Sequence, residues 1–122
     1  MFEVIGTEIH CTRGDCGSFL IKCNFDGGPY TFRAGDAIRF RVCRKKDYGT
    51  VVLTKEVKLT EDAQEVEIYL NSEDTRIGEI INKPVDYWYE VELVADGKTQ
   101  TIFGHTVDGA RVFKLLPEGK EE

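Results

Sequence analysis

The segment Val85-Asp86-Tyr87-Trp88-Tyr89-Glu90-Val91-Glu92-Leu93-Val94 carries the strongest β-strand signal in the chain. Apolar and aromatic side chains alternate along it with Trp88 and two glutamates. Because successive side chains of a strand point to opposite faces, this alternation predicts one face packed on a core and one face turned to solvent. Asp96-Gly97 follows as a typical hairpin turn, and residues 99–103 are expected to return as the paired strand.

Similar alternation recurs on both sides of this segment, and helical periodicity is nearly absent. Further strands are expected at residues 4–10, 18–23, 30–32, 38–42, 51–59, 66–70 and about 107–115. Only residues 71–81 carry helix signals, because Ser72 could cap a first turn that contains Thr75, and one short helical turn is expected near residues 72–80. About eight or nine short antiparallel strands separated by turns predict an all-β fold, specifically an immunoglobulin-like β-sandwich.

The chain has 122 residues, a usual size for one domain, and contains no internal repeat and no linker. An apolar share of 41% and a charged share of 31% are those of a globular protein with a well-solvated surface. Residues 1–116 are therefore expected to form a single β-sandwich domain. Residues 117–122 are polar and are expected to be a frayed C-terminal tail.

The charge balance disfavours several classes of partner. The chain has 22 acidic and 16 basic residues, a formal net charge of −6, which repels phosphate backbones and anionic membranes. The N-terminus lacks the basic region and apolar stretch of a signal peptide, and no window approaches the ~20 apolar residues of a membrane span. We expect a soluble protein made in the cytoplasm, with no nucleic-acid and no membrane partner.

The fragment 14–18, Gly-Asp-Cys-Gly-Ser, resembles the nucleophile loop of chymotrypsin-like viral cysteine proteases. That chemistry needs an imidazole within hydrogen-bond reach of the thiol. His10 is the only histidine upstream of Cys16, and the chain is too short for the two barrels of those enzymes. A glycine-rich turn between two strands is the favoured interpretation.

Arg13-Gly14-Asp15 also spells an integrin-type tripeptide, but glycine and aspartate are what a tight turn requires in any case. We expect Asp15 to bond loop amides and Arg13 to pair with a carboxylate. The predicted structural turn comprises Thr12, Arg13, Gly14 and Asp15.

The four cysteines form no C-x-x-C pair, and neighbouring His10 and Cys11 should point to opposite faces of a strand, so no metal site is expected. If residues 12–15 form a four-residue loop, Cys11 and Cys16 would face each other across a hairpin, where a disulfide could form. A cytoplasmic origin argues instead for free thiols. Cys23 is expected to be a small core residue.

Two features could form an interface. Arg39 and Arg41 alternate along one strand, next to a turn that adds Arg44, Lys45 and Lys46. This basic group could meet an acidic partner, or it could be a solvated face paired with carboxylates of the neighbouring strand.

Trp88 points away from the core in the predicted strand. It could anchor an interface, stack on a sugar, or lie beneath residues 71–81.

Catalysis finds no support in the sequence. Two histidines and two serines do not assemble into a nucleophile, a base and an orienting group, and no phosphate-binding loop is present. Glu90 and Glu92 are two apart on a strand and are expected on its solvated face rather than across a cleft. We expect no catalytic residue and no cofactor.

The order of short motifs resembles the N-terminal domain of baseplate upper proteins of tailed phages and their prophage relatives. The resemblance spans about residues 5–115 and rests on Thr12-Arg13-Gly14-Asp15, Tyr30-Thr31-Phe32-Arg33-Ala34-Gly35-Asp36-Ala37-Ile38-Arg39-Phe40, Lys55, Glu73-Asp74-Thr75 and Tyr87-Trp88-Tyr89-Glu90-Val91-Glu92-Leu93. It implies an immunoglobulin-like fold and a structural role in the virion, through assembly with itself or with other tail proteins. Family members often continue into a linker and further domains, and the cysteines are not part of the family pattern. An adaptor or accessory role is therefore also open.

The expected function is that of a non-enzymatic phage or prophage structural protein of the tail or baseplate, assembled in the bacterial cytoplasm and located in the virion. The alternative is a carbohydrate-binding β-sandwich in which Trp88 is the stacking platform. A cysteine hydrolase built on Cys16 comes third.

Overall fold

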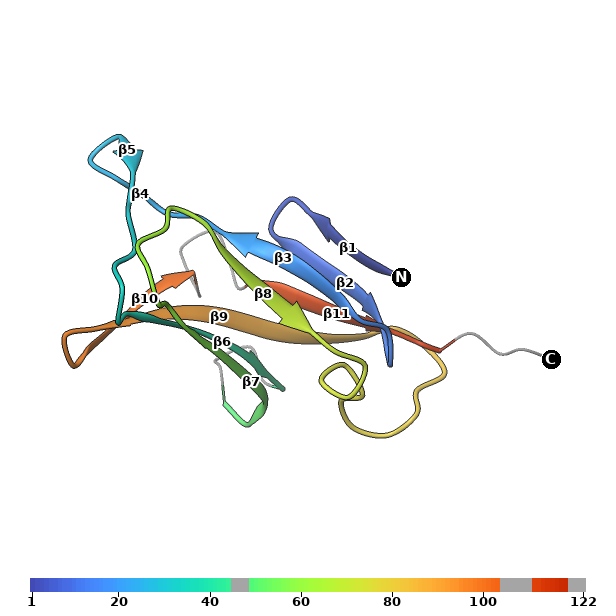
Figure 1. The fold of residues 1–122 in the computed structure, drawn as a ribbon. Helices are drawn as coiled ribbons and strands as arrows, with labels where there is room; N and C mark the ends of the chain where they lie inside the picture. Colours follow the sequence, from blue (N-terminus) through green and yellow to red (C-terminus); the bar gives the residue numbers. More distant parts are fainter. Residues whose placement is uncertain (45–48, 104–110, 119–122) are drawn as a thin grey trace.

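The computed structural model describes residues 1–44, 49–103 and 111–118, and in this part of the chain it contains eleven β-strands and no helix (Figure 1). The all-β class expected from the sequence is confirmed. The strands are β1 (Phe2–Ile5), β2 (Glu8–Thr12), β3 (Gly17–Ile21), β4 (Asn24–Phe25), β5 (Gly28–Pro29), β6 (Ala37–Cys43), β7 (Val51–Lys58), β8 (Val66–Leu70), β9 (Val85–Ala95), β10 (Lys98–Phe103) and β11 (Val112–Leu116).

The long strand β9 lies at the centre of a seven-stranded sheet, in which six strands follow the order β1-β2-β11-β9-β6-β7 and β10 is a seventh that pairs with β9. One edge of β9 pairs with β6 from Trp88 to Val94. The other edge pairs first with β11, over Val85 to Trp88, and then with β10, beyond the Asp96-Gly97 turn. Both turn residues have positive φ, +52° and +74°, as a tight hairpin turn of this kind requires.

The expectation of purely antiparallel strands is wrong at one place, because β2 pairs with β11 in parallel. A parallel pair needs a long connection between its strands. Here the connection is most of the chain, from Thr12 to Val112, so the sheet is mixed.

The second layer is the two-stranded sheet of β3 and β8, which packs on one face of the large sheet (Figure 1). The core between them is centred on Phe40, whose ring lies 5.0 Å from Phe19 of β3, 5.6 Å from Tyr89 and 6.3 Å from Phe113. Burying a side chain of this size contributes about 1.5–3 kcal/mol. Strands β4 and β5 form a separate two-residue ladder at one end.

The predicted strand at residues 4–10 is in fact the hairpin of β1 and β2. Gly6, at φ +62°, reverses the chain between them. The predicted strand at 30–32 is reduced to a single bridge between Phe32 and Ala63. Of the predicted strand at 107–115, residues 107–110 lie outside the described residues.

The predicted helical turn near residues 72–80 is absent, and turns without a helix connect β8 to β9. The backbone N–H of Asp74 donates to Asn71 Oδ1 at 2.8 Å, and that of Asn71 donates to Asp74 Oδ2 at 2.9 Å. Such side-chain bonds to the local backbone compete with helical hydrogen bonding. The Asp74 carboxylate also forms an ion pair with Lys55 Nζ at 2.8 Å. This contact attaches the segment to β7.

Candidate functional site

Arg39, Arg41 and Trp88 all lie on the outward face of the large sheet. In the register of β6 and β9, Arg39 stands opposite Glu92, Arg41 opposite Glu90 and Cys43 opposite Trp88. The structure therefore brings the three predicted interface residues onto one face.

The two arginines on this face are engaged by carboxylates of the same chain. Glu92 accepts from Arg39 Nη1 at 3.1 Å through one oxygen and from Arg41 Nη2 at 3.0 Å through the other. Arg41 also pairs with Glu90, and Arg39 Nε donates to Glu56 of β7 at 3.2 Å. The hydrogen bond to Glu56 is the main cause that raises the pKa of Arg39, so its charge is stabilised.

This ion-paired face is far less solvated than the sequence suggested. Glu90 is 7% and Glu92 8% exposed, and Cys43 is completely buried. Trp88 is half-buried beside Cys43 and Val112, its partners in the neighbouring strands. Of the basic turn predicted next to these arginines, Lys45 and Lys46 lie outside the described residues.

The Thr12–Asp15 turn joins three distant segments. The guanidinium of Arg13, 9% exposed, donates from Nε to Ile77 O at 3.2 Å and from Nη2 to Gly78 O at 2.6 Å. Its Nη1 lies 3.3 Å from Glu118 Oε1. Arg13 is thereby committed to the loop between β8 and β9 and to the segment after β11.

The rest of the turn bonds the buried hydroxyl of Thr75, which accepts from the Gly14 N–H at 2.9 Å and donates to Asp15 O at 2.8 Å. The Asp15 carboxylate pairs with the N-terminal ammonium of Met1. Thr12 accepts from the Asp15 N–H at 2.9 Å, which closes the turn. The contacts of all four residues are internal to the fold.

Cys11 and Cys16 do not face each other across a hairpin, because β2 and β3 belong to different sheets, and both thiols are free in this structure. Burial raises the pKa of the Cys11 thiol to about 11, and burial also raises the pKa of Cys43. Cys16 is exposed and Cys23 is half-buried. Burial therefore keeps two of the four thiols protonated and shielded from reagents.

The cysteine-protease interpretation needs the Cys16 thiol within hydrogen-bond reach of the His10 imidazole, and within the described residues no hydrogen bond joins the two. His10 lies on the opposite face of β2 from Cys11, and its Nε2 is 2.8 Å from Glu8 Oε1. Within the described residues, no group of three or more His, Cys, Asp or Glu side chains is arranged to hold a metal ion. In the same part of the chain, none of the elements is a helix of the length and apolarity needed to cross a membrane.

Sequence reasoning missed a groove between the β1–β2 hairpin and β3. Val4 lies on the core side of β1 and Leu20 on the outer side of β3, and they are 49% and 55% exposed at its rim. Ile9 and Tyr89 are among its buried lining residues, and the cavity volume is about 150 Å³. At the other end of β1, the ring of Phe2 lies against Gly17, where a Cβ would come within 2.2 Å of the ring. No local signal marks this groove, because it depends on how the β1–β2 hairpin of the large sheet lies against β3 of the second layer.

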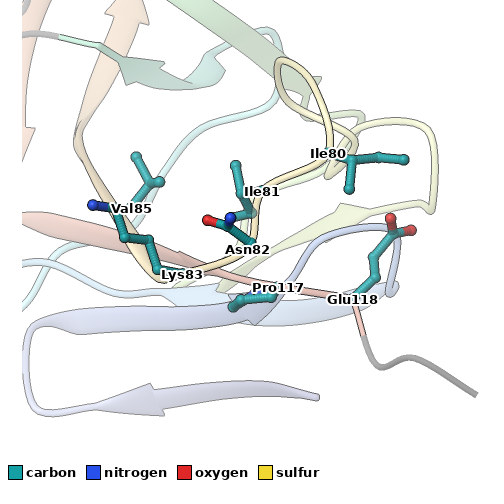
Figure 2. A pocket seen from close by; sticks show the side chains of 7 residues that line it. All are labelled: Ile80, Ile81, Asn82, Lys83, Val85, Pro117 and Glu118. Carbon is teal, nitrogen blue, oxygen red and sulfur yellow. The ribbon is translucent and has the colours of Figure 1, made fainter.

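A larger hollow lies between the loop that precedes β9 and the segment that follows β11 (Figure 2). Its volume is about 640 Å³, within the range of small-molecule sites. The lining consists of Ile80, Ile81, Asn82, Lys83, Val85, Pro117 and Glu118. The one sequence signal for it is the adjacent pair Ile80-Ile81 in a loop that is mostly polar.

No protein-family model matches the chain, and no curated protein or solved structure is significantly similar to it.

Proposed function

We propose that the chain is an immunoglobulin-like β-sandwich that serves as a structural protein of a phage or prophage tail or baseplate. Support for the fold comes from strand order. In the large sheet β11, β9, β6 and β7 follow one another as strands G, F, C and C′ do in variable-type immunoglobulin domains. In the second layer β3 and β8 take the places of strands B and E.

The role in the virion rests on the resemblance of the motifs to baseplate upper proteins. Three of these motifs meet in the fold. The Thr12–Asp15 turn bonds the Glu73-Asp74-Thr75 segment through Thr75, and Lys55 pairs with Asp74. A shared set of internal contacts explains why these short motifs would occur together in one kind of sandwich.

The main structural support for an assembly function is the groove beside β3. Within the described residues β3 pairs with β8 alone, so its other edge has unpaired backbone N–H and C=O groups. Val4 and Leu20 stand exposed at that groove. An open strand edge next to exposed apolar side chains is a common place for a partner strand to add.

The experiment is size-exclusion chromatography with light scattering on the full chain, alone and mixed with the proteins encoded by neighbouring tail genes. We expect a complex with itself or with one of these proteins. Leu20→Glu should weaken it by at least about tenfold, because it places a charge in the apolar groove. Val51→Glu is the matched control, since Val51 is similarly exposed, at 45%, but lies on β7.

A strict monomer that binds none of the neighbouring proteins would count against this function, as would equal losses in the two variants. The carbohydrate-binding alternative is tested on the same samples with a glycan array and a Trp88→Ala control. Glycan binding that depends on Trp88 would replace the assembly function.

A further inference from the structure

The hollow between the β8–β9 loop and the end of β11 has two walls that are far apart in sequence. Ile80, Ile81 and Val85 belong to one wall, and Pro117 belongs to the other (Figure 2). Ile80 is 73% exposed, the highest value among the large hydrophobic side chains that the structure describes. It adjoins three further apolar side chains of the same concave surface, Ile81, Val85 and Pro117, and a concave surface with grouped apolar side chains is typical of a binding site.

Both walls are held by one buried side chain. Arg13 donates to Ile77 O and to Gly78 O, two residues before Ile80, and pairs with Glu118 in the opposite wall. Thr75 fixes the start of the same loop to the Thr12–Asp15 turn. The hollow is therefore preformed without regular secondary structure in its loop, and a ligand would not have to order it on binding.

The charge of the lining points to the chemistry of the occupant. Glu118 is compensated by Arg13, whereas Lys83 is exposed and makes no ion pair with any described residue. The uncompensated charge of the lining is thus positive, beside four apolar side chains and the amide of Asn82. A carboxylate next to an aliphatic side chain complements both features.

We propose that this hollow is a docking pocket for an extended segment of a partner protein that presents an aliphatic side chain beside an acidic one. The aliphatic side chain lies among Ile80, Ile81, Val85 and Pro117, and the carboxylate pairs with Lys83. The pocket is separate from the groove beside β3, and no residue lines both. A pocket that binds no peptide would therefore not contradict the proposed assembly through β3.

The test is a titration of the isotope-labelled full chain with the capped peptide Asp-Leu-Asp-Leu-Asp, followed by amide chemical shifts. We expect saturable shifts at residues 80–85 and 117–118. Lys83→Glu should lower the affinity for this peptide by about tenfold, because it reverses the charge at the rim of the pocket. Lys58→Glu, an exposed lysine of β7 outside the pocket, should not.

The capped peptide Lys-Leu-Lys-Leu-Lys separates charge recognition from unspecific apolar binding. Three results would overturn the proposal: equal affinity for the two peptides, equal losses in the two lysine variants, or no shift at residues 80–85 up to about 5 mM peptide, an affinity too weak for docking. Ile80→Ser is a second variant, and the fold is retained because Ile80 is exposed. It should also lower the affinity for the acidic peptide.

Discussion

On β9, Tyr89 and Val91 face the second layer whereas Glu90 and Glu92 face outward, and all four side chains are shielded from solvent. The inward pair is covered by aromatic and aliphatic side chains around Phe40. The outward pair is covered by the guanidinium groups and stems of Arg39 and Arg41. One strand thus has two buried faces built by different interactions.

The comparison shows what alternation can and cannot specify. It correctly assigns each side chain of β9 to a face, because the strand period of two is geometric. It does not give the degree of burial, which depends on the neighbours across the sheet. Buried carboxylates stay ionised only where cations compensate their lost hydration.

The largest expected effect is on the inward face. Phe40→Ala should lower the free energy of unfolding by about 3–5 kcal/mol, since it removes the ring that contacts both layers and leaves a cavity. Urea denaturation followed by circular dichroism measures this. Tyr69→Ala, an aromatic residue 51% exposed on β8, is the control and should change stability by less than about 1 kcal/mol. Similar losses in the two variants would place the core elsewhere.

Alkylation by iodoacetamide tests whether the outward face is as closed as the inward one. Cys11 lies on the inward face and Cys43 on the outward face, and both are completely buried, while Cys16 is exposed. In the native protein both buried thiols should react at least about a hundredfold more slowly than Cys16, because they react only when the structure opens. Mass spectrometry of the labelled peptides gives the three rates. Rapid labelling of Cys43 together with protection of Cys11 would break the comparison.

A smaller effect is expected for the ion pairs of the outward face. Glu92→Gln should cost about 1–3 kcal/mol, because Glu92 is buried and bridges both arginines. Glu56→Gln should cost less than about 1 kcal/mol, since Glu56 is half exposed and contacts Arg39 alone. Chemical denaturation of the two variants measures the difference. Equal values would mean that burial adds nothing to these pairs.

The smallest expected effect is a pH dependence that comes from the inward face. The folded pKa of Cys11, about 11, lies above the reference value of 9.0, so above pH 9 the unfolded chain releases a proton that the folded chain keeps. This contribution to stability is complete below pH 9 and is lost as the pH rises toward 11, by about 1 kcal/mol between pH 8 and pH 10. Denaturation at both pH values measures it, and Cys11→Ala should remove this part of the slope. An unchanged slope in that variant would contradict it.

Local chemistry was sufficient to predict several elements. Asp96-Gly97 specifies its hairpin, and the alternation of Val66–Leu70 matches its burial. These features depend on residues that are close together in the sequence, so a single sequence is enough to predict them.

Long-range contacts determine what the sequence could not supply. The loop after β8 takes its shape from Arg13, more than sixty positions earlier in the chain, and from Lys55. The parallel pairing of β2 with β11 has no local signature, because each strand is ordinary in itself. The two surface hollows arise where such segments meet, and neither has a motif of its own.

The parallel β2–β11 pair also determines how the fold would respond to being stretched between its ends. A pull on the N-terminus opens β1 from β2 one pair at a time, beginning at Phe2 and Cys11. The force then acts on β2 at Glu8 and on β11 at Leu116. Because the two strands are parallel, these points lie at opposite ends of the pair, and all of its hydrogen bonds are loaded in shear at once. Single-molecule extension should resolve a weak event followed by a strong one, and a single weak rupture would rule this out. The parallel pair would therefore resist a pull between the ends more strongly than the β1–β2 hairpin.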